Sequence, residues 1–200
     1  MKELIEMGRS LKDMGFLELL AILAGLYVVL PRIYYFVEVM QISFGVVQKD
    51  LLRRYYNYNT ESYAVITGGT AHIGKELAMR LGKIGFSIVL IGKNKDKLED
   101  TKKRILAQSR VRVKIILADL ASNKPEIYSQ HIYPELKDLD IAIFVNNCYD
   151  CARGYFKDIP LERLHKQLMT NSLHYLYMLH FLANKMQERE GMKRSAIINI

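Results

Sequence analysis

Residues 63–74 constrain this chain more than any other stretch: a short apolar run breaks into a glycine-rich turn (YAVITGGTAHIG) and passes into a helical pattern over 75–81. An apolar run that ends in glycines is typical of a buried parallel strand, and the glycines let the backbone turn sharply toward a pyrophosphate at the positive end of the next helix. The stretch therefore predicts a strand, a phosphate-binding loop and a helix. Taken alone, it also fits an ordinary strand-to-helix turn without a ligand.

Apolar runs and helical patterns alternate through the rest of the chain. The expected strands are 63–67, 86–91, 111–118, 141–145 and 195–200. The expected helices are 74–85, 94–108, a stretch near 126–136 and a long one from 161 towards 190. Strands that alternate with helices in this way indicate an α/β fold, a Rossmann-like doubly wound parallel sheet.

Further motifs follow the glycine-rich turn in order. Asp119 lies in Ala-Asp-Leu, Asn146 and Asn147 follow an apolar strand, and Asn171 lies in the long helix. Together with the turn itself, these motifs resemble the N-terminal two-thirds of the short-chain dehydrogenase/reductase family. The resemblance is strongest to the membrane-anchored branch that contains 17β-hydroxysteroid dehydrogenase type 12 and the very-long-chain 3-oxoacyl-CoA reductases, and it covers about 63–200.

The resemblance implies a nicotinamide dinucleotide cofactor. The residues that it places at this cofactor are Thr67, Gly68, Ile73, Gly74, Asp119, Asn146 and Asn147. Selectivity is read at the end of the second strand, where an acidic side chain would bind the ribose hydroxyls of NAD. This chain has Lys93 there, which can pair with a 2′-phosphate, so we expect NADP(H). The alternative for Lys93 is a solvated charge at the start of a helix.

Two positions depart from the family pattern. His72 replaces the middle glycine of the phosphate loop, and Tyr149 replaces the glycine that follows Asn-Asn-x. Both put a side chain where the backbone is expected to approach the nucleotide closely. We therefore expect His72 and Tyr149 to obstruct or reshape the pocket. The alternative for His72 is a cationic contact to phosphate.

The chemistry that the resemblance implies is hydride transfer from NADPH to a carbonyl. In the family a tyrosine acts as general acid, a lysine lowers its pKa and a serine holds the carbonyl oxygen. Asn171 matches the asparagine of the proton relay, but the serine and the Tyr-x-x-x-Lys would lie beyond Ile200. The pentapeptide 133–137 (YPELK) has the right letters, but it lies between the third and fourth strands and contains a proline.

These features predict a Rossmann-like domain that is truncated at its C-terminal side and cannot perform the reduction alone. The long helix is apolar nearly all round over 173–186, and such a helix must be covered on more than one side. We therefore expect an accessory subunit of a larger membrane assembly, with a partner subunit covering 173–186. The alternative is an active NADPH-dependent 3-oxoacyl-CoA or 17β-hydroxysteroid reductase of which only this portion is represented.

The N-terminal region predicts a membrane anchor. Residues 16–30 are apolar except for Glu18, and the apolar pattern resumes over 33–37 after Pro31 and Arg32. A helix over about 15–37 is long enough to cross a bilayer, which takes about 20 residues. The expected organisation is an anchor at 1–47, a linker at 48–62 and a partial reductase domain at 63–200. The alternative is a buried or interfacial helix pair in a complex.

The family resemblance favours the endoplasmic reticulum, with a mitochondrial membrane as the alternative. The 29 Lys and Arg against 21 Asp and Glu give a formal charge of +8, which suits nucleotide phosphate and a membrane surface. No nucleic-acid motif accompanies this charge, so nucleic acid is not an expected partner.

The only cysteines, Cys148 and Cys151, form a Cys-x-x-Cys sequence. A zinc site needs about four ligands, and the sequence offers no second pair. We therefore expect ordinary buried thiols and no metal site.

Overall fold

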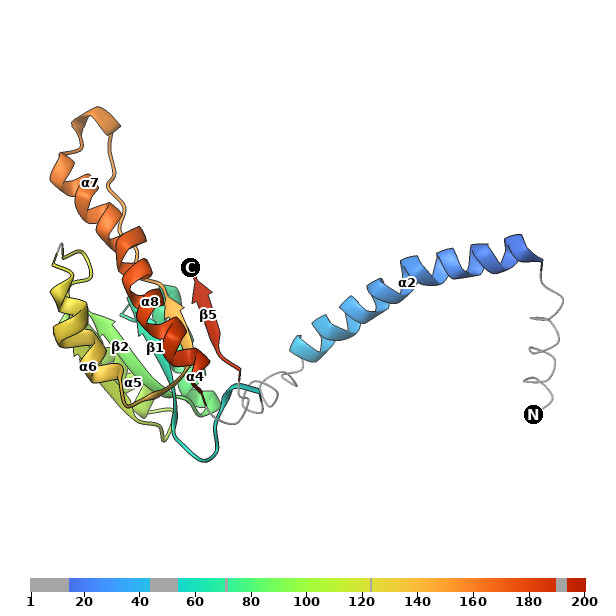
Figure 1. Ribbon diagram of the computed structural model, residues 1–200, viewed down its shortest axis with the longest axis horizontal. Coiled ribbons are helices and arrows are strands. Elements are labelled where there is room, and N and C mark those ends of the chain that lie inside the picture. Colours follow the sequence, from blue (N-terminus) through green and yellow to red (C-terminus); the bar gives the residue numbers. More distant parts are fainter. Residues whose placement is uncertain (1–14, 44–53, 71, 123, 190–193) are drawn as a thin grey trace. The chain divides into compact units, whose positions relative to one another are not determined.

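The computed structural model describes residues 15–43, 54–70, 72–122, 124–189 and 194–200 (Figure 1). The chain divides into two compact units, Met1–Val47 and Gln48–Ile200.

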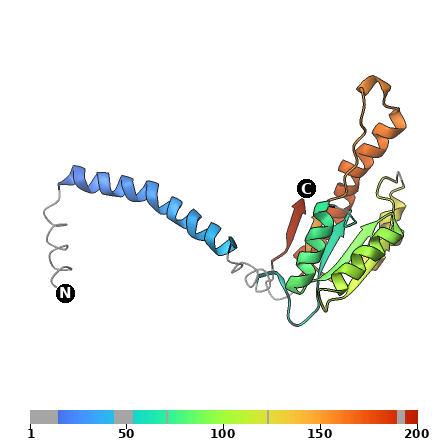
Figure 2. The same cartoon turned by 180° about the vertical axis from the view of Figure 1, so that it is seen from behind.

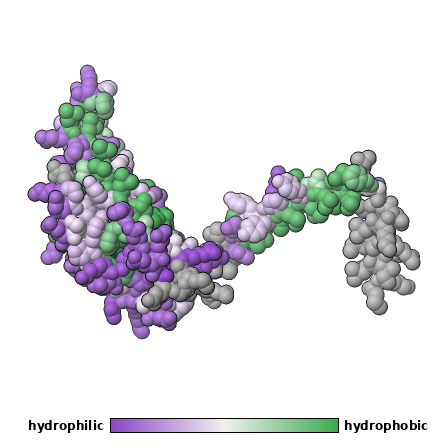
Figure 3. Space-filling view, in the orientation of Figure 1, coloured by the Kyte–Doolittle hydropathy of each residue, from purple (hydrophilic) through white to green (hydrophobic). Residues whose placement is uncertain are grey.

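The first unit contains the apolar helix α2 (Phe16–Ser43). Its segment Glu18–Gln41 is long and apolar enough to cross a membrane, and none of it is buried by the rest of the chain. Figure 3 shows hydrophobic side chains along most of this helix. The expected N-terminal apolar helix is present, but it ends at Ser43 and not near 37, because apolar residues continue on both sides of Glu38.

The second unit is built on one five-stranded parallel sheet, as expected. Its strands are β1 (Ser62–Thr67), β2 (Ser87–Gly92), β3 (Val113–Leu117), β4 (Asp140–Asn146) and β5 (Ala196–Asn199). Their order across the sheet is β3-β2-β1-β4-β5. The Rossmann-like doubly wound sheet is thereby confirmed, and the chain reverses its direction of winding between β1 and β4.

Helices cover both faces of this sheet. One face is covered by α4 (His72–Ile84) and α5 (Lys95–Leu106), which lie in front in Figure 2. The other face carries the π-helical turn η1 (Tyr128–Ile132), α6 (Tyr133–Leu136) and α8 (His174–Gln187), which lie in front in Figure 1. The helix before α8 is α7 (Leu161–Leu168), joined to it by the π-helical turn η3 (Met169–Leu173); the 3₁₀ turn η2 (Phe156–Asp158) precedes α7.

Alternate strand residues fill two separate cores. Ile66 and Leu90 pack on the side of α4 and α5, while Val65, Val89 and Phe144 pack on the side of α8. All five side chains are fully buried. Strands buried on both faces read as continuous apolar runs and not as alternating ones, which explains the patterns of β1, β2 and β4.

A buried arginine closes the amino-terminal end of the sheet. The Arg189 side chain is 3% exposed, and its guanidinium donates to the Asp140 carboxylate (Nε to Oδ1 2.6 Å, Nη2 to Oδ2 2.9 Å). It also donates to Ser62 Oγ (3.3 Å) and to the carbonyl oxygen of Tyr55 (2.8 Å). Burial alone would raise the pKa of Asp140, but the hydrogen bonds from Arg189 and Ser62 lower it overall. Arg189 thus ties the segment after α8 to the starts of β1 and β4.

Candidate functional site

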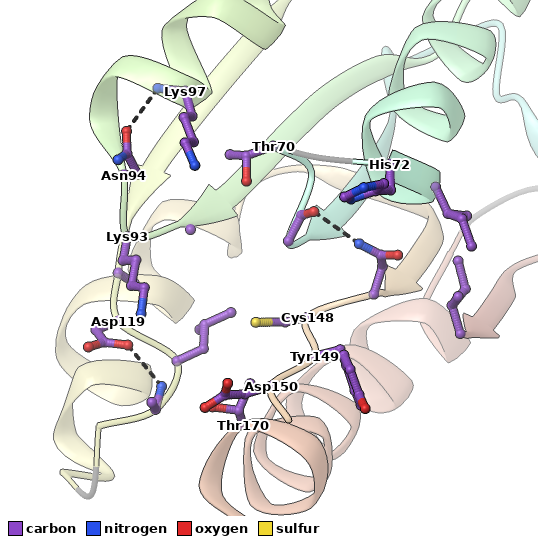
Figure 4. Close-up of a pocket in the computed structure, with 18 residues that line it drawn as sticks. Thr70, His72, Lys93, Asn94, Lys97, Asp119, Cys148, Tyr149, Asp150 and Thr170 are labelled. Atoms are coloured by element: carbon purple, nitrogen blue, oxygen red, sulfur yellow. Dashed lines mark hydrogen bonds between the residues drawn. The ribbon is translucent and has the colours of Figure 1, made fainter. Parts of the chain in front are cut away.

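A pocket of about 730 Å³ lies at the carboxyl ends of the strands (Figure 4). Its walls come from the segments that follow β1, β2, β3 and β4, including Gly68, Lys93, Asp119 and Asn147. In open parallel α/β sheets ligands bind outside the carboxyl ends, at the point where the strand order reverses. The pocket lies at that point.

Gly68 in the phosphate loop and Gly74 at the start of α4 both disfavour a side chain. Gly68 has φ +66°, in the left-handed region. A Cβ added at Gly74 would lie 2.3 Å from Asn147 Nδ2 and 2.8 Å from the carbonyl oxygen of Gly68. The loop therefore presents backbone at the start of α4, as the approach of a phosphate requires.

The Asn146-Asn147 segment is held against this loop by Thr67. The Thr67 hydroxyl is fully buried and accepts from the backbone N–H groups of Asn147 (3.2 Å) and Cys148 (3.3 Å). Asn147 Nδ2 in turn donates to the carbonyl oxygen of Gly68 (2.9 Å). Thr67 and Asn146 are not among the residues that line the pocket, so their part is to position the residues that do. Gly68, Ile73, Asp119 and Asn147 line it directly.

His72 begins α4 with φ +48°, a conformation that side-chain-bearing residues rarely adopt. Its side chain is exposed and borders the pocket (Figure 4). This backbone conformation explains why glycine suits the position in the resemblance described above. Obstruction by His72 stays a prediction.

Positive charge gathers where β2 ends. Lys93 and Lys97 both line the pocket, as does Asn94 between them. Asn94 caps α5, because its Oδ1 accepts from the backbone N–H of Lys97 (2.9 Å). Of these two lysines, only Lys93 was predicted from the sequence, and Lys97 was not. Its spacing of four residues from Lys93, across a capping asparagine, was the signal for a second cation in the site.

The opposite wall is the segment after β4, and Asn171 holds it in place. Asn171 Oδ1 accepts from the backbone N–H of Asp150 (2.9 Å), and its Nδ2 donates to the carbonyl oxygen of Asp150 (2.8 Å). Gln167 Oε1 accepts from the Ala152 N–H (3.1 Å). Arg163 forms an ion pair with the Asp150 carboxylate and lowers its pKa. Asn171 lies in the π-helical turn η3, a feature frequent at functional sites.

Both cysteines lie in this segment after β4. Cys148 lines the pocket, and burial raises the pKa of its thiol to about 11, which keeps it protonated at neutral pH. Cys148 is only partly buried and Cys151 is exposed, so the expectation of two buried thiols is wrong for Cys151, where the chain leaves the sheet. Tyr149 borders the pocket with 70% of its surface exposed, and whether it blocks a nucleotide stays a prediction. The described residues contain no cluster of three or more His, Cys, Asp or Glu arranged to hold a metal.

The pentapeptide at 133–137 lies away from this pocket. It spans α6, on the sheet face covered by α8. The Tyr133 hydroxyl donates to the carbonyl oxygen of Tyr177 (2.6 Å), and burial raises its pKa to about 12. Tyr133 therefore serves packing between helices.

A family comparison agrees with this geometry. The family model described as "short chain dehydrogenase" matches residues 62–200, which include the whole sheet and the pocket. The chain belongs to the short-chain dehydrogenase family.

Two curated relatives place it more closely within this family. The very-long-chain 3-oxoacyl-CoA reductase of Bos taurus is 38% identical over 143 residues, 69% of this chain and 44% of the relative. The inactive hydroxysteroid dehydrogenase-like protein 1 of Homo sapiens is 34% identical over 153 residues, 76% of this chain and 43% of the relative. The chain thus spans less than half the length of these relatives, and they include an enzyme and a protein named inactive.

A solved structure shows the same fold. The short-chain dehydrogenase from Sphingobium yanoikuyae, in complex with NADPH, superposes with a TM-score of 0.62 at 24% identity, over 69% of this chain and 52% of its own. At this identity the likeness shows the fold alone.

Proposed function

We propose that this chain is a membrane-anchored short-chain dehydrogenase/reductase-like protein that binds NADP(H) and does not reduce a carbonyl by itself. The observation that carries the nucleotide part is the pocket at the strand-order reversal, with a glycine loop at one end and two lysines at the other. A dinucleotide has this same layout, a pyrophosphate beside an adenosine that carries the 2′-phosphate in NADP.

The residues present fit NADP better than NAD. The segment after β2 offers Lys93 and Lys97 to a 2′-phosphate and has no acidic side chain at the position of Lys93 to accept ribose hydrogen bonds. The backbone of the loop at Gly68 and the start of α4 would hold the pyrophosphate, and Asp119 would lie by the adenine, as the family resemblance implies. Bound NADPH would supply a hydride; the residues described here would bind and orient it.

The proposed lack of reductase activity rests on the other lining residues. In the described part of the pocket, the only tyrosine is the exposed Tyr149, and both lysines lie at the end of β2. A general acid must lie within hydrogen-bond reach of the carbonyl oxygen, and its pKa must be lowered by a neighbouring charge. No lining residue of the described pocket combines these properties. Asn171 is engaged with the backbone of Asp150, so its part here is to position the wall.

A role as an accessory subunit extends the same proposal. Leu168 and Leu176 expose more than half of their surface, and Tyr155 and Phe156, before α7, expose about three quarters of theirs. Exposed apolar side chains in such density mark association surfaces. We therefore assign the outer side of 173–186 and the preceding helix to a protein partner. The membrane is the one that α2 would span, the endoplasmic reticulum by resemblance to the 3-oxoacyl-CoA reductases.

The nucleotide proposal is tested by calorimetric titration of the full chain in detergent with NADPH and with NADH. We expect NADPH to bind more tightly. Lys93→Ala and Lys97→Ala should each weaken NADPH about fivefold to tenfold, since an exposed charge pair contributes roughly 1 kcal/mol, and should leave NADH unchanged. Lys83→Ala, an exposed lysine at the end of α4, is the matched control. Absence of saturable binding, or equal affinity for both nucleotides, would contradict the proposal.

A second candidate is the active reductase of which this chain is a portion. It is favoured by the relatives' length, since the chain spans 44% of a 3-oxoacyl-CoA reductase to which it is 38% identical. The coding sequence downstream of Ile200 decides between the two: a serine followed by Tyr-x-x-x-Lys would support the reductase. Turnover of a 3-oxoacyl-CoA with NADPH by the 200-residue chain itself would overturn the first candidate.

A further inference from the structure

A second groove, of about 750 Å³, runs along the outer edge of β3 and shares no lining residue with the nucleotide pocket. β3 is an edge strand of the sheet. The groove is lined by side chains of α5, of β3 with the residue before it, and of the opposite sheet face: Lys95, Glu99, Lys102, Arg112, Val113, Lys114, Ile115, Leu117, Tyr63 and Leu139. It therefore follows the free edge on both faces of the sheet.

Backbone hydrogen bonds show which groups of β3 point outward. The carbonyl oxygen of Arg112 accepts from the N–H of Ile88, and the N–H of Ala118 donates to the carbonyl oxygen of Gly92, both at 2.9 Å. The backbone groups of the even-numbered residues therefore point toward β2. Because backbone groups alternate along a strand, the N–H and C=O groups of the odd-numbered residues point away from the sheet. His131 Nε2 lies 3.0 Å from the carbonyl oxygen of Leu117, which agrees with this register.

Two residues of the edge are left with unpaired backbone groups. In the described structure the N–H and C=O of Val113 and Ile115 have no hydrogen-bond partner outside the sheet. An unpaired edge is a template on which an extended segment can add as a further strand. Leu117 is closed to such pairing at its carbonyl, so the open edge is centred on Val113 and Ile115.

The charges on both sides of this edge select the partner. Lys95 and Lys102 lie on the side of α5 and, among the described residues, form no ion pair. Lys114 lies on the other side, where it pairs with Glu135 (2.8 Å), and Arg112 pairs with Glu61 (3.1 Å). Among the described residues that line the groove, Glu99 is the only acidic one. A second copy of the same edge would bring these cations against one another, which disfavours self-pairing.

We propose that the β3 edge binds an acidic segment of a protein partner in extended conformation, by strand addition. Backbone groups of Val113 and Ile115 pair with the added strand, whose alternate side chains reach the two faces of the sheet. Those on the side of α5 meet Lys95 and Lys102, so acidic residues are required at every second position of the segment. This site is separate from the nucleotide pocket, and its test does not depend on nucleotide binding.

The test measures binding of a fluorescein-labelled peptide of alternating glutamate and valine to the full chain in detergent, by fluorescence anisotropy at low and high salt. We expect saturable binding that weakens as salt rises, and at least tenfold weaker binding of the peptide in which glutamine replaces glutamate. Lys95→Glu and Lys102→Glu should each weaken binding of the acidic peptide severalfold. Lys83→Glu, on α4, should leave it unchanged.

A backbone variant separates strand addition from general charge attraction. Ile115→Pro removes an outward N–H that makes no bond within the sheet, and an edge strand tolerates proline at such a position. The variant should keep its circular dichroism spectrum and lose peptide binding. If this variant binds normally, or if Lys83→Glu weakens binding as much as Lys102→Glu, the edge is not the site. Concentration-dependent self-association abolished by Ile115→Pro would assign the edge to a second copy and overturn the acidic partner.

Discussion

The two ends of the parallel sheet are built in opposite ways. At the amino-terminal end, Arg189 is almost fully buried and bonded to Asp140, Ser62 and the backbone of Tyr55. At the carboxyl end, the cations Lys93 and Lys97 stand exposed around a pocket. The polar groups at the amino-terminal end are thus paired with one another, whereas those at the carboxyl end are exposed to a ligand. This difference indicates that the amino-terminal end contributes stability and the carboxyl end contributes binding.

The largest expected effect is at the closed end. Arg189→Ala leaves the partly buried Asp140 carboxylate without its cation, and breaking a buried pair in this way costs about 3–5 kcal/mol. Urea denaturation of the full chain in detergent, followed by circular dichroism, measures this loss. Arg189→Lys keeps the charge but not the forked geometry, and should lie between the variant and the parent chain.

A matched surface pair controls for the loss of an arginine. Arg80 pairs with Glu76 (2.7 Å) with 72% of its side chain exposed, so Arg80→Ala should change the free energy of unfolding by about 0.5 kcal/mol or less. If Arg189→Ala were no worse than Arg80→Ala, the amino-terminal end would not be the stabilising one.

The second prediction concerns acid, and a histidine in the core on the α8 side of the sheet. His174 is fully buried, its Nε2 has no hydrogen-bond partner among the described residues, and its Nδ1 lies 3.4 Å from the Tyr128 hydroxyl. Burial lowers the pKa of His174 from 6.5 to about 4. The unfolded chain therefore binds a proton below pH 6.5 that the folded chain refuses until about pH 4. Stability is thus full above pH 6.5 and falls by about 3 kcal/mol as the pH drops to 4.

His174→Phe isolates this contribution from that of the carboxylates. Phenylalanine keeps an aromatic ring beside Tyr128 and has no proton to bind, so the variant should lose less stability than the parent chain between pH 6.5 and 4. Parallel pH profiles for the two chains would show that His174 is protonated, or exposed, in the folded state.

Much of the closed core could be predicted from sequence, because β-branched runs and helical periodicity depend on local residue order. The strands β1 to β5 were found in this way, with ends within two residues. Arg189 was not found, because it belongs to no motif and its partners Asp140 and Tyr55 lie 49 and 134 residues away in the chain. Long-range polar networks of this kind leave no periodic signal.

At the carboxyl end of the sheet, the sequence predicted which residues belong to the pocket better than it predicted the role of each. The glycines and Asn147 were found from their pattern, and Lys93 from its place after a strand. That Thr67 and Asn146 support the lining from behind depends on three-dimensional packing. The exposure of Cys151 was missed because the sequence does not show where the chain turns away from the sheet.

The third prediction tests whether packing and binding meet at the phosphate loop. Gly74→Ala places a Cβ against Asn147 Nδ2 and the backbone of Gly68, and overpacking of this kind costs about 1–3 kcal/mol. NADPH affinity should fall with it, because the loop must shift. In Gly92→Ala, by contrast, the new Cβ would lie 3.6 Å from its nearest neighbour on Leu98. Gly92 lines the pocket as well. Because its new Cβ makes only ordinary contacts, that variant should keep stability and NADPH affinity close to those of the parent chain. Equal losses of stability and affinity in the two variants would contradict the prediction that the site depends on glycine at position 74.

The smallest expected effect, at Asn94, separates stability from nucleotide binding most clearly. Asn94 caps α5 and lines the pocket, so Asn94→Ala should cost about 1 kcal/mol through the lost bond to the Lys97 N–H. Asn94→Asp keeps the cap and suits the positive end of the helix, so stability should be retained. The same carboxylate beside Lys93 and Lys97 should weaken NADPH severalfold and NADH much less, because only NADP carries the 2′-phosphate. Asn184→Ala, within α8, should be neutral or slightly stabilising, since alanine favours a helix interior more than asparagine does. A chain in which Asn94→Asp lost stability and kept its preference for NADPH would contradict the assignment of this end of the sheet to nucleotide selection.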